Sequence, residues 1–510
     1  MKHLLYIIIT CCLFACAEQP KDVTYKDELP PMYPDYANVT IPKNIAPLNF
    51  LLRGDFEGVQ VTATCNDKQM QVTERGSSVR FDIDDWKDLL QHTAGKSVNV
   101  TVTAKTGGKW YAYKQFTWQV TTDTIDPYLT YRLIEPDYEI WQNLTLRERC
   151  LETFDERVIS DYNLVENRCM NCHIYGNQDP SLSMMYIRGE GGGAILNRNG
   201  KLSKLGIKTD DMVSGSVYYC FSPDGRYITF STNIIIPAFH SMPKKRLEVF
   251  DTKSDVYVAD LENNVIIESP LLADSTILET FPTFSPDGKS IYYCAADATP
   301  LKTNNIKGLQ YVLVRIPFDP ITASFGERVD TIFPLPRSTQ RGALHAKNMR
   351  DTNERYLSET DKEHPSSVCH PKISPDGRYL LYTVAHYGTF PIWHPETDLQ
   401  MINLKTGTID TLAIVNSKKS DTYHCWSSNS RWFVFASKRD DGLYGKPYFC
   451  YIDSNGKAHK PFVLPQENPD FYDNCLKSFN APELGRGTLP FDAMDISRAM
   501  KQDIIPFKKK

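Results

Sequence analysis

The sequence predicts an all-β protein: a β-propeller of about six blades, preceded by a small β-sandwich-like domain and a short helical segment. Three observations predict this: a repeated turn-and-strand motif, alternating polar and apolar residues near the N-terminus, and 510 residues of which 41% are hydrophobic. A chain of this length holds more than one domain. We expect the following segments: signal peptide 1–15, polar tether 16–40, sandwich 41–125, helical segment 126–180, propeller 181–470 and C-terminal extension 471–510.

The N-terminus has the pattern of an export signal. Met1-Lys2-His3 is a short positive start, and the apolar run over residues 4–15 is shorter than the roughly 20 residues that a permanent membrane helix needs. Leu13-Phe14-Ala15-Cys16 resembles the lipobox of bacterial lipoproteins, where cleavage before the cysteine permits lipidation. We therefore expect Cys16 to carry a lipid and residues 16–40, which are polar and proline-rich, to act as a tether. An ordinary secretory signal is the alternative.

Residues 41–125 show the alternation of half-buried strands. It is clearest over residues 59–63, 98–102 and 116–120, and glycines mark the turns between them. This pattern is typical of a β-sandwich. Between residues 136 and 168 apolar residues recur at mixed helical spacing, which predicts one or two helices.

Cys169-Met170-Asn171-Cys172-His173 is the most specific motif of the chain. Cys-x-x-Cys-His lets two thiols bond covalently to haem while the histidine ligates its iron. We expect Cys169 and Cys172 to be the thioether anchors and His173 to be an axial ligand of one covalent haem c. A zinc site would need a second ligand pair at similar spacing, which we do not find. A thioredoxin-like pair would have to follow a strand of a βαβ unit, whereas a helix and loop are predicted here.

The distal haem ligand is not determined by spacing. Met184 and Met185 are nearest in sequence, and a methionine ligand would raise the reduction potential. The alternative is that both methionines pack in the core. More distant candidates, each of which has a structural or surface role as its alternative, are His240, His370, His386, His394 and His424.

The C-terminal two-thirds contain an internal repeat. Ser-Pro-Asp-Gly begins at Ser222, Ser285 and Ser374, and a degenerate copy begins at Ser427; each is followed by a strand-like run. Proline pre-sets φ, aspartate can bond its own backbone, and glycine accepts a left-handed conformation, so each copy predicts a tight turn into a strand. Spacings exceed the roughly 40–50 residues of a simple blade, so longer loops or an unmarked blade must fill the gaps.

These repeats resemble those of TolB-like six-bladed β-propellers. The chain as a whole is similar to a family of Bacteroidetes lipoproteins that combine such a propeller with one Cys-x-x-Cys-His motif. The resemblance covers nearly all of the mature chain, including residues 41–50, 131–136 and 426–432. The resemblance implies the architecture, a lipid anchor and a haem. It says much less about the activity, because the function of the family is poorly defined.

Composition and motifs narrow the function classes. A net charge of −5 with interspersed signs argues against nucleic acid as a partner. No Gly-x-Ser-x-Gly elbow occurs, and too few residues follow 470 for a hydrolase domain. We expect an electron-transfer or redox-sensing protein of the cell envelope, facing the periplasm or the exterior, with the membrane and envelope or redox proteins as partners. The alternatives are a haem-free propeller scaffold that binds envelope proteins or peptides and, less favoured, an enzyme acting on glycan or peptide.

Overall fold

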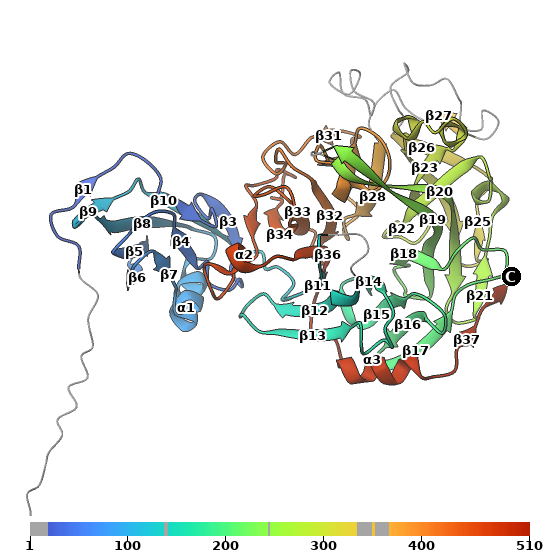
Figure 1. The fold of residues 1–510 in the computed structure, drawn as a ribbon, viewed down its shortest axis with the longest axis horizontal. Helices are drawn as coiled ribbons and strands as arrows, with labels where there is room; N and C mark the ends of the chain where they lie inside the picture. The colour runs from blue at the N-terminus through green and yellow to red at the C-terminus, as the bar shows by residue number, and fades with distance from the viewer. Residues whose placement is uncertain (1–18, 137–140, 243–244, 334–348, 352–366) are drawn as a thin grey trace, which may run out of the picture. The chain divides into compact units, whose positions relative to one another are not determined.

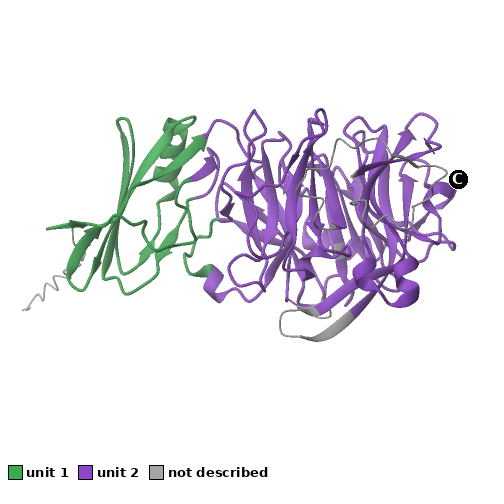
Figure 2. Ribbon diagram, turned by 90° about the horizontal axis from the view of Figure 1, so that it is seen from above, with its two compact units in different colours: residues 1–38, 47–120, 465–471 green, residues 39–46, 121–464, 472–510 purple. Residues whose placement is uncertain are grey.

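A computed structural model describes residues 19–136, 141–242, 245–333, 349–351 and 367–510 (Figure 1). The predicted signal peptide 1–15 and Cys16 lie outside the described residues. The described chain is mostly β and forms two compact units (Figure 2). The first takes in residues up to Asn38, Pro47–Val120 and Pro465–Phe471; the second takes in Val39–Ala46, Thr121–Leu464 and Tyr472–Lys510. Within the described ranges, no helix combines the length and apolar character that crossing a bilayer requires.

The first unit packs two sheets and a helix around an aromatic core. Asp82 caps the helix by accepting hydrogen bonds from the N–H groups of Asp84 and Asp85. The helix buries Trp86, whose ring centroid lies 5.3 Å from that of Trp118. Its elements are β1 (Thr24–Tyr25), β5 (Gly58–Cys65), β6 (Lys68–Arg75), β8 (Ser97–Thr106), β9 (Lys109–Ala112) and β10 (Phe116–Thr121) in one sheet, β2 (Met32–Tyr33), β4 (Phe50–Leu52) and β7 (Ser78–Val79) in the other, and α1 (Ile83–Thr93).

Two details of the first unit differ from the sequence predictions. Helix α1 interrupts the expected all-β domain. The described part of the predicted tether is folded: β1 pairs with β9 and β2 pairs with β4, and Tyr36 is fully buried. Proline-rich composition predicted a solvated linker, but short strand pairs and one aromatic anchor hold this segment against the domain.

The described residues of the second unit form six sheets. Each sheet contains a row of four antiparallel strands. The first sheet consists of β11 (Tyr128–Ile134), β12 (Thr145–Cys150), β13 (Glu156–Asp161) and β36 (Ser478–Gly485), and the second of β14 (Met170–Gly176), β15 (Asp179–Ile187), β16 (Gly193–Arg198), β17 (Lys201–Gly206) and β37 (Ile505–Pro506). The third sheet consists of β18 (Ser216–Phe221), β19 (Tyr227–Met242), β20 (Lys245–Asp260), β21 (Val265–Ile267) and β38 (Lys508–Lys509), and the fourth of β22 (Ile277–Phe284), β23 (Ser290–Asp297), β24 (Val312–Asp319), β25 (Ser324–Phe325), β26 (Val329–Phe333) and β27 (Met349–Asp351). The fifth sheet consists of β28 (Ser367–Ile373), β29 (Tyr379–Ala385), β30 (Asp398–Asn403) and β31 (Ile409–Asp410), and the sixth of β32 (Asp421–Trp426), β33 (Trp432–Ser437), β34 (Lys446–Tyr451) and β35 (Phe462–Val463). The unit also holds β3 (Val39–Pro42), most of α2 (Phe471–Asn474) and α3 (Ala493–Met500).

The six sheets form a closed ring. One strand at the end of each sheet, here called its inner strand, contacts the inner strands of the two neighbouring sheets, in the order β36, β14, β18, β22, β28, β32 and back to β36. The first sheet joins strands from both ends of the unit, because β36 pairs with β11. The hydrogen bonds between β36 and β11 close the ring, so every sheet has a neighbouring sheet on both sides. This is an arrangement of the β-propeller type.

The Ser-Pro-Asp-Gly repeats form the tight turns that were predicted from their residues. In the third copy Ser374 donates to Asp376 (2.7 Å) and accepts from the N–H of Tyr379 (3.0 Å), while Gly377 has φ +71°. The copies at Ser222 and Ser285 have the same bonds. Each turn joins an inner strand to the second strand of its sheet, so the repeats mark four of the six sheets.

The boundaries of the ring differ from the sequence prediction. The segment 126–180 holds strands β11 to β14, so the predicted helices over this range are wrong, and the ring begins near residue 128 instead of 181. Helix-forming residues in β12 are overridden by pairing with two neighbouring strands. The extension 471–510 contributes β36, helix α3 and the parallel edge strands β37 and β38. Such long-range pairing leaves no local sequence signal.

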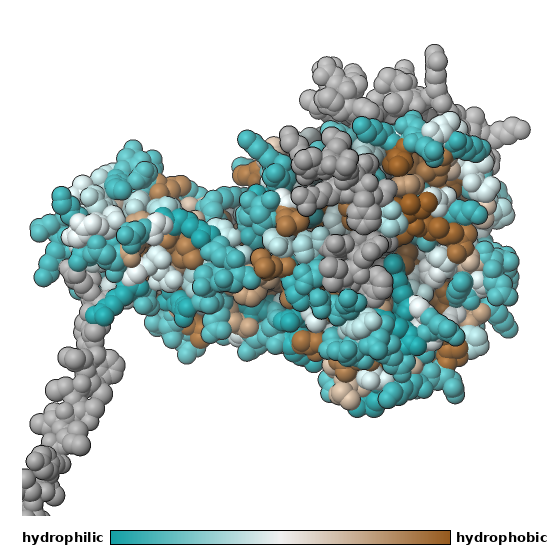
Figure 3. Space-filling view, in the orientation of Figure 1, coloured by the Kyte–Doolittle hydropathy of each residue, from teal (hydrophilic) through white to brown (hydrophobic). Residues whose placement is uncertain are grey.

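The visible face of the molecule is mainly hydrophilic outside the grey residues. Figure 3 shows hydrophilic residues over most of the visible face, with hydrophobic residues in scattered patches. Exposed apolar side chains of the second unit include Ile234 and Ile236 on β19 and Ile321. Scattered exposed apolar residues are usual in folded proteins, and they define no docking face by themselves.

Candidate functional site

A cavity of about 540 Å³ lies within the ring of sheets. All six inner strands contribute to its lining, together with Arg132 from β11 and residues near Trp393 and Lys438. This volume falls in the range of roughly 300–1,000 Å³ that is typical of small-molecule and cofactor pockets. A central cavity of this kind is where a propeller brings side chains from distant parts of the chain together.

Every inner strand carries a β-bulge at the cavity. At the bulge the pairing register shifts, and one residue other than glycine has a left-handed backbone, which L-residues seldom adopt. All six of these bulge residues line the cavity. With their φ values they are Ala481 (47°) in β36, Cys172 (50°) in β14, Tyr218 (55°) in β18, Phe281 (52°) in β22, His370 (53°) in β28 and Tyr423 (48°) in β32.

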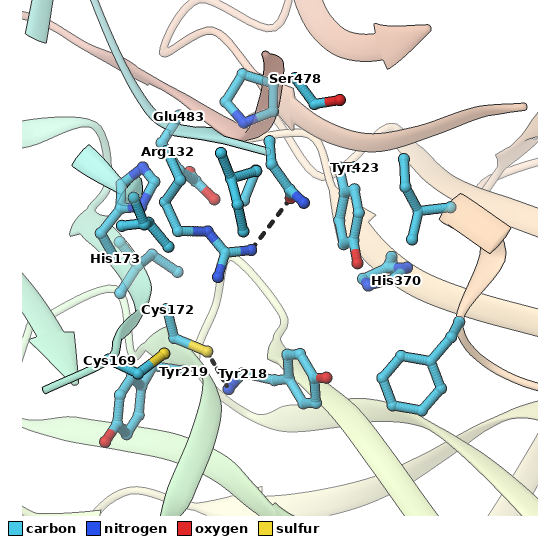
Figure 4. Close-up of a pocket in the computed structure, with 18 of the residues that line it drawn as sticks. Arg132, Cys169, Cys172, His173, Tyr218, Tyr219, His370, Tyr423, Ser478 and Glu483 are labelled. Carbon is cyan, nitrogen blue, oxygen red and sulfur yellow. Dashed lines mark hydrogen bonds between the residues drawn. The ribbon is translucent and has the colours of Figure 1, made fainter. Parts of the chain in front are cut away.

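The Cys-x-x-Cys-His motif lies across one of these bulges. Cys169 immediately precedes β14, Cys172 is the bulge residue, and both side chains line the cavity as free thiols. The Cys172 Sγ accepts a hydrogen bond from the N–H of Tyr218 at 3.5 Å, and burial raises the pKa of Cys169. Figure 4 shows the two sulfur atoms on the same side of the cavity. The strand conformation therefore brings both thiols to one place, although no helix carries them.

His173 follows the bulge and also lines the cavity. Neither of its ring nitrogens has a hydrogen-bond partner of normal geometry among the described residues. Burial, assisted by Arg132 and partly offset by the backbone of Thr130, lowers the pKa of His173 to about 3, so the imidazole is neutral. Its ring lies on the side of β14 toward Arg132 and away from the two sulfur atoms (Figure 4). A neutral imidazole without a partner is the form that binds a metal ion.

His424 occupies the place in β32 that His173 occupies in β14, directly after the bulge residue. Its Nε2 lies 3.0 Å from the carbonyl oxygen of Leu381 in the preceding sheet, and burial lowers its pKa to about 3. The two histidines therefore differ in their contacts: His424 lies within hydrogen-bonding distance of a backbone carbonyl in the neighbouring sheet, whereas among the described residues His173 has no hydrogen bond of normal geometry.

The structure does not bring the two methionines that were predicted as distal ligands to the cavity. Met184 and Met185 lie in β15, directly beside β14, where Met185 pairs with His173 and Met184 pairs with Ile174. Both are almost fully buried in hydrophobic clusters, and neither lines the cavity. Side chains of adjacent paired strands lie too close together for a porphyrin to stand between them. The core-packing alternative describes their position.

The other histidines named from sequence lie in different surroundings. His370 and His424 line the cavity. His394 is buried, with its Nε2 3.2 Å from Glu248 and its Nδ1 3.1 Å from Glu396, and His386 lies 3.6 Å from Glu396. These two residues do not line the cavity. The side chain of His240 lies outside the described residues.

The charges at the cavity are mainly positive. Its described lining contains the basic residues Arg132, Arg168, Arg188, Lys372 and Lys438 and the acidic residues Glu135 and Glu483. Lys372 lies 3.8 Å from Glu483, and burial lowers the pKa of Lys438 to about 8. This balance favours an anionic ligand.

Sequence reasoning missed the ring of bulge residues, although a signal for it exists. Tyr218, Phe281, His370 and Tyr423 each lie four residues before the serine of a turn repeat, at Ser222, Ser285, Ser374 and Ser427. Aligning the repeats on that serine would have placed the four side chains at equivalent positions. Cys172 and Ala481 lie in the two sheets without a repeat, so only the fold adds them.

The donor set fits a covalently bound haem. Two free thiols and a neutral histidine contribute to the lining of one cavity, and basic residues are available for the two carboxylates of a porphyrin. Among the described residues no group of three or more His, Cys, Asp or Glu side chains is arranged to hold a bare metal ion.

Comparison with known proteins adds little to this description. No family model and no curated protein matches the chain. Solved structures with some likeness include an oligogalacturonate lyase in complex with manganese (11% identity, TM-score 0.32, covering 66% of this chain and 84% of that one), dipeptidyl peptidase 4 from Porphyromonas gingivalis (9%, 0.33, 72% and 58%) and prolyl oligopeptidase B from Galerina marginata (8%, 0.33, 89% and 61%). The chain thus spans less than two-thirds of either peptidase. The assignment of the fold rests on the strand pairing.

Proposed function

We propose that this protein is a lipid-anchored lipoprotein of the cell envelope that carries one covalent haem c and acts in electron transfer or redox sensing. The observation that supports this most directly is the presence of Cys169, Cys172 and His173 in the lining of one cavity of about 540 Å³. The six sheets would be the blades of a TolB-like propeller, which provides a rigid frame for the haem and a docking surface for a redox or envelope protein partner. Cys16 would carry the lipid.

In this proposal each group has a distinct role. The S–H bonds of Cys169 and Cys172 would add across the two vinyl groups of the haem to give two thioethers, and His173 would ligate its iron. The haem would supply one-electron exchange. Basic residues such as Arg132 and Lys438 would balance its carboxylates, and the apolar bulge residue Phe281 would exclude water. Burial in such surroundings is one of the means by which a protein adjusts a haem potential.

A second function is favoured by the position of His173. It matches that of His424, which contacts the neighbouring sheet, so the motif would also be compatible with a structural role. The protein would then be a propeller scaffold that binds envelope proteins or peptides without haem. The two functions differ in a property that is visible in the purified protein, its colour.

The deciding experiment is an absorption spectrum of the oxidised and reduced protein, made with a c-type haem maturation system. We expect an α-band in the reduced protein and haem that stays attached on denaturation. Cys169→Ala/Cys172→Ala should abolish both. Cys220→Ala/Cys425→Ala is a matched control, because these free cysteines lie in two other inner strands. A colourless wild-type protein from a competent maturation system would contradict the haem proposal and favour the scaffold.

A further inference from the structure

His370 lies across the ring from the Cys-x-x-Cys-His strand. The inner strands follow in the order β36, β14, β18, β22, β28 and β32, so β28 is three sheets from β14 in either direction. Cys172 and His370 are the bulge residues of these two opposite strands. Both line the cavity, and Figure 4 shows His370 on the far side from the two sulfur atoms. A group held between the two sides would meet the thiols on one side and this imidazole on the other.

The imidazole of His370 is available to a ligand. His370 is only 9% exposed, and neither its Nδ1 nor its Nε2 has a hydrogen-bond partner among the described residues. Burial holds its pKa well below the usual range, so it is neutral. An unpartnered buried imidazole costs free energy, because its nitrogens have lost the hydrogen bonds that water would supply. Binding a metal ion would offset that cost.

Aromatic neighbours hold the His370 ring in place. The ring centroid of Phe281 lies 3.9 Å away, that of Tyr423 lies 4.8 Å away, and that of Tyr218 lies 6.4 Å away. These are the bulge residues of the strands on both sides and of the next strand but one. Because packed aromatic rings restrict the imidazole, the cavity presents it in a defined position without a polar contact to compete for its nitrogens.

Other side chains of the cavity are poorer ligands. The Nε2 of His424 is directed to the Leu381 carbonyl oxygen. Met184 and Met185 do not reach the cavity.

We propose that His370 is the second axial ligand of the haem iron, so that two histidines coordinate it. This inference rests on the proposed haem, and it specifies the type of redox centre. Two histidine ligands give a lower reduction potential than the histidine and methionine pair expected from sequence. The partner would therefore be a donor or acceptor that operates at low potential.

His370→Asn tests the inference, because asparagine adopts the left-handed backbone readily and so keeps the bulge while removing the imidazole. In the protein with covalent haem, we expect this variant to lose the low-spin spectrum of the ferric wild type and to bind carbon monoxide when reduced. Added imidazole should restore the low-spin spectrum. His424→Asn removes the other cavity histidine, whose Nε2 is directed to the Leu381 carbonyl oxygen; it is the matched control and should keep the low-spin spectrum.

A low-spin spectrum in His370→Asn that matches the wild type would overturn the assignment of His370 while leaving the haem in place. Absence of covalent haem from the wild type itself would overturn both this inference and the proposed function. His370→Met provides a second measurement if the asparagine variant does not fold. It should retain a six-coordinate haem and raise its reduction potential, and an unchanged potential would also contradict the inference.

Discussion

In four sheets the inner strand carries a bulge at the cavity and, four residues later, the serine that begins a tight turn. The bulge and the turn repeat in different ways. The turns repeat residues: three copies keep serine, proline, aspartate and glycine. The bulges repeat only the backbone, since tyrosine, phenylalanine and histidine occupy the same left-handed position. The turns therefore depend on particular residue types, whereas the bulges share a backbone conformation that places different side chains at one cavity.

The physical requirements of the two regions explain the difference. The turn needs a hydroxyl to bond the backbone, a carboxylate to receive it and a residue that accepts positive φ. The bulge requires only that some residue tolerate the left-handed conformation, at a cost of about 1–2 kcal/mol for residues other than glycine. The bulge side chain therefore varies freely, and it is there that a ligand set can be assembled.

We expect the largest effect on the haem spectrum to distinguish His173 from His424, which occupy equivalent positions in two inner strands. His173→Asn should change the haem spectrum by removing an axial ligand, while the covalently attached haem remains. His424→Asn should leave the spectrum unchanged and lower the free energy of unfolding by about 1 kcal/mol, because it disturbs only the contact with Leu381. Absorption spectra and denaturant titrations of both variants provide the check. Equal spectral changes would remove the distinction between the two histidines.

A buried and a turn aspartate should respond to pH in opposite directions. Burial raises the pKa of Asp251 to about 7, although Asn233 and Tyr311 donate hydrogen bonds to it; a bond from Ser285 lowers the pKa of the turn residue Asp287. Asp251 keeps its proton in the folded state but loses it near pH 4 when unfolded, so its contribution to stability falls as pH rises from about 4 to 7. Asp287 contributes above pH 4 and loses its contribution as pH falls.

The measurement for Asp251 is the free energy of unfolding against pH. Asp251→Asn should remove the decrease between pH 4 and 7, and at pH 8 it should be the more stable protein by at most about 4 kcal/mol, given roughly 1.4 kcal/mol for each pKa unit. Asp287→Asn is the turn counterpart and should reduce stability at pH 8. A parallel pH profile for wild type and Asp251→Asn would show that Asp251 is not the titrating group.

Ser374→Ala should weaken the frame without affecting the cavity. Its hydroxyl is fully buried and makes two hydrogen bonds, to Asp376 and from the N–H of Tyr379. Loss of both should cost about 1–3 kcal/mol of unfolding free energy, measured by denaturant titration. We expect the spectrum of the bound haem to be that of the wild type, although His370 lies only four residues away. A spectral change would mean that the turn and the bulge are coupled.

Gly377→Ala should have the smallest effect. Gly377 has φ +71°, and an added Cβ would lie 3.9 Å from Pro286, which is ordinary contact. The change therefore introduces only backbone strain, about 1 kcal/mol, and should lower the unfolding midpoint slightly. A loss far beyond this value would show that the turn tolerates less movement than its open surroundings indicate.

The sequence alone determined the parts of this protein that depend on local chemistry. Ser-Pro-Asp-Gly predicted the turns, and alternation of polar and apolar residues predicted the strands of the first unit. Cys169, Cys172 and His173 predicted a covalent haem, which stays a prediction. These predictions needed only neighbouring residues, because a turn, a strand face or a Cys-x-x-Cys-His motif is defined within a few positions of the chain.

The tertiary structure decided what depends on residues far apart. It turned the predicted helical segment into strands, closed the ring by pairing β36 with β11, and directed Met184 and Met185 into the core. It also placed His370 opposite Cys172, almost 200 residues away. Strand pairing and ring closure are set by the summed burial of the whole unit, so no short segment carries the information about which side chains share the cavity.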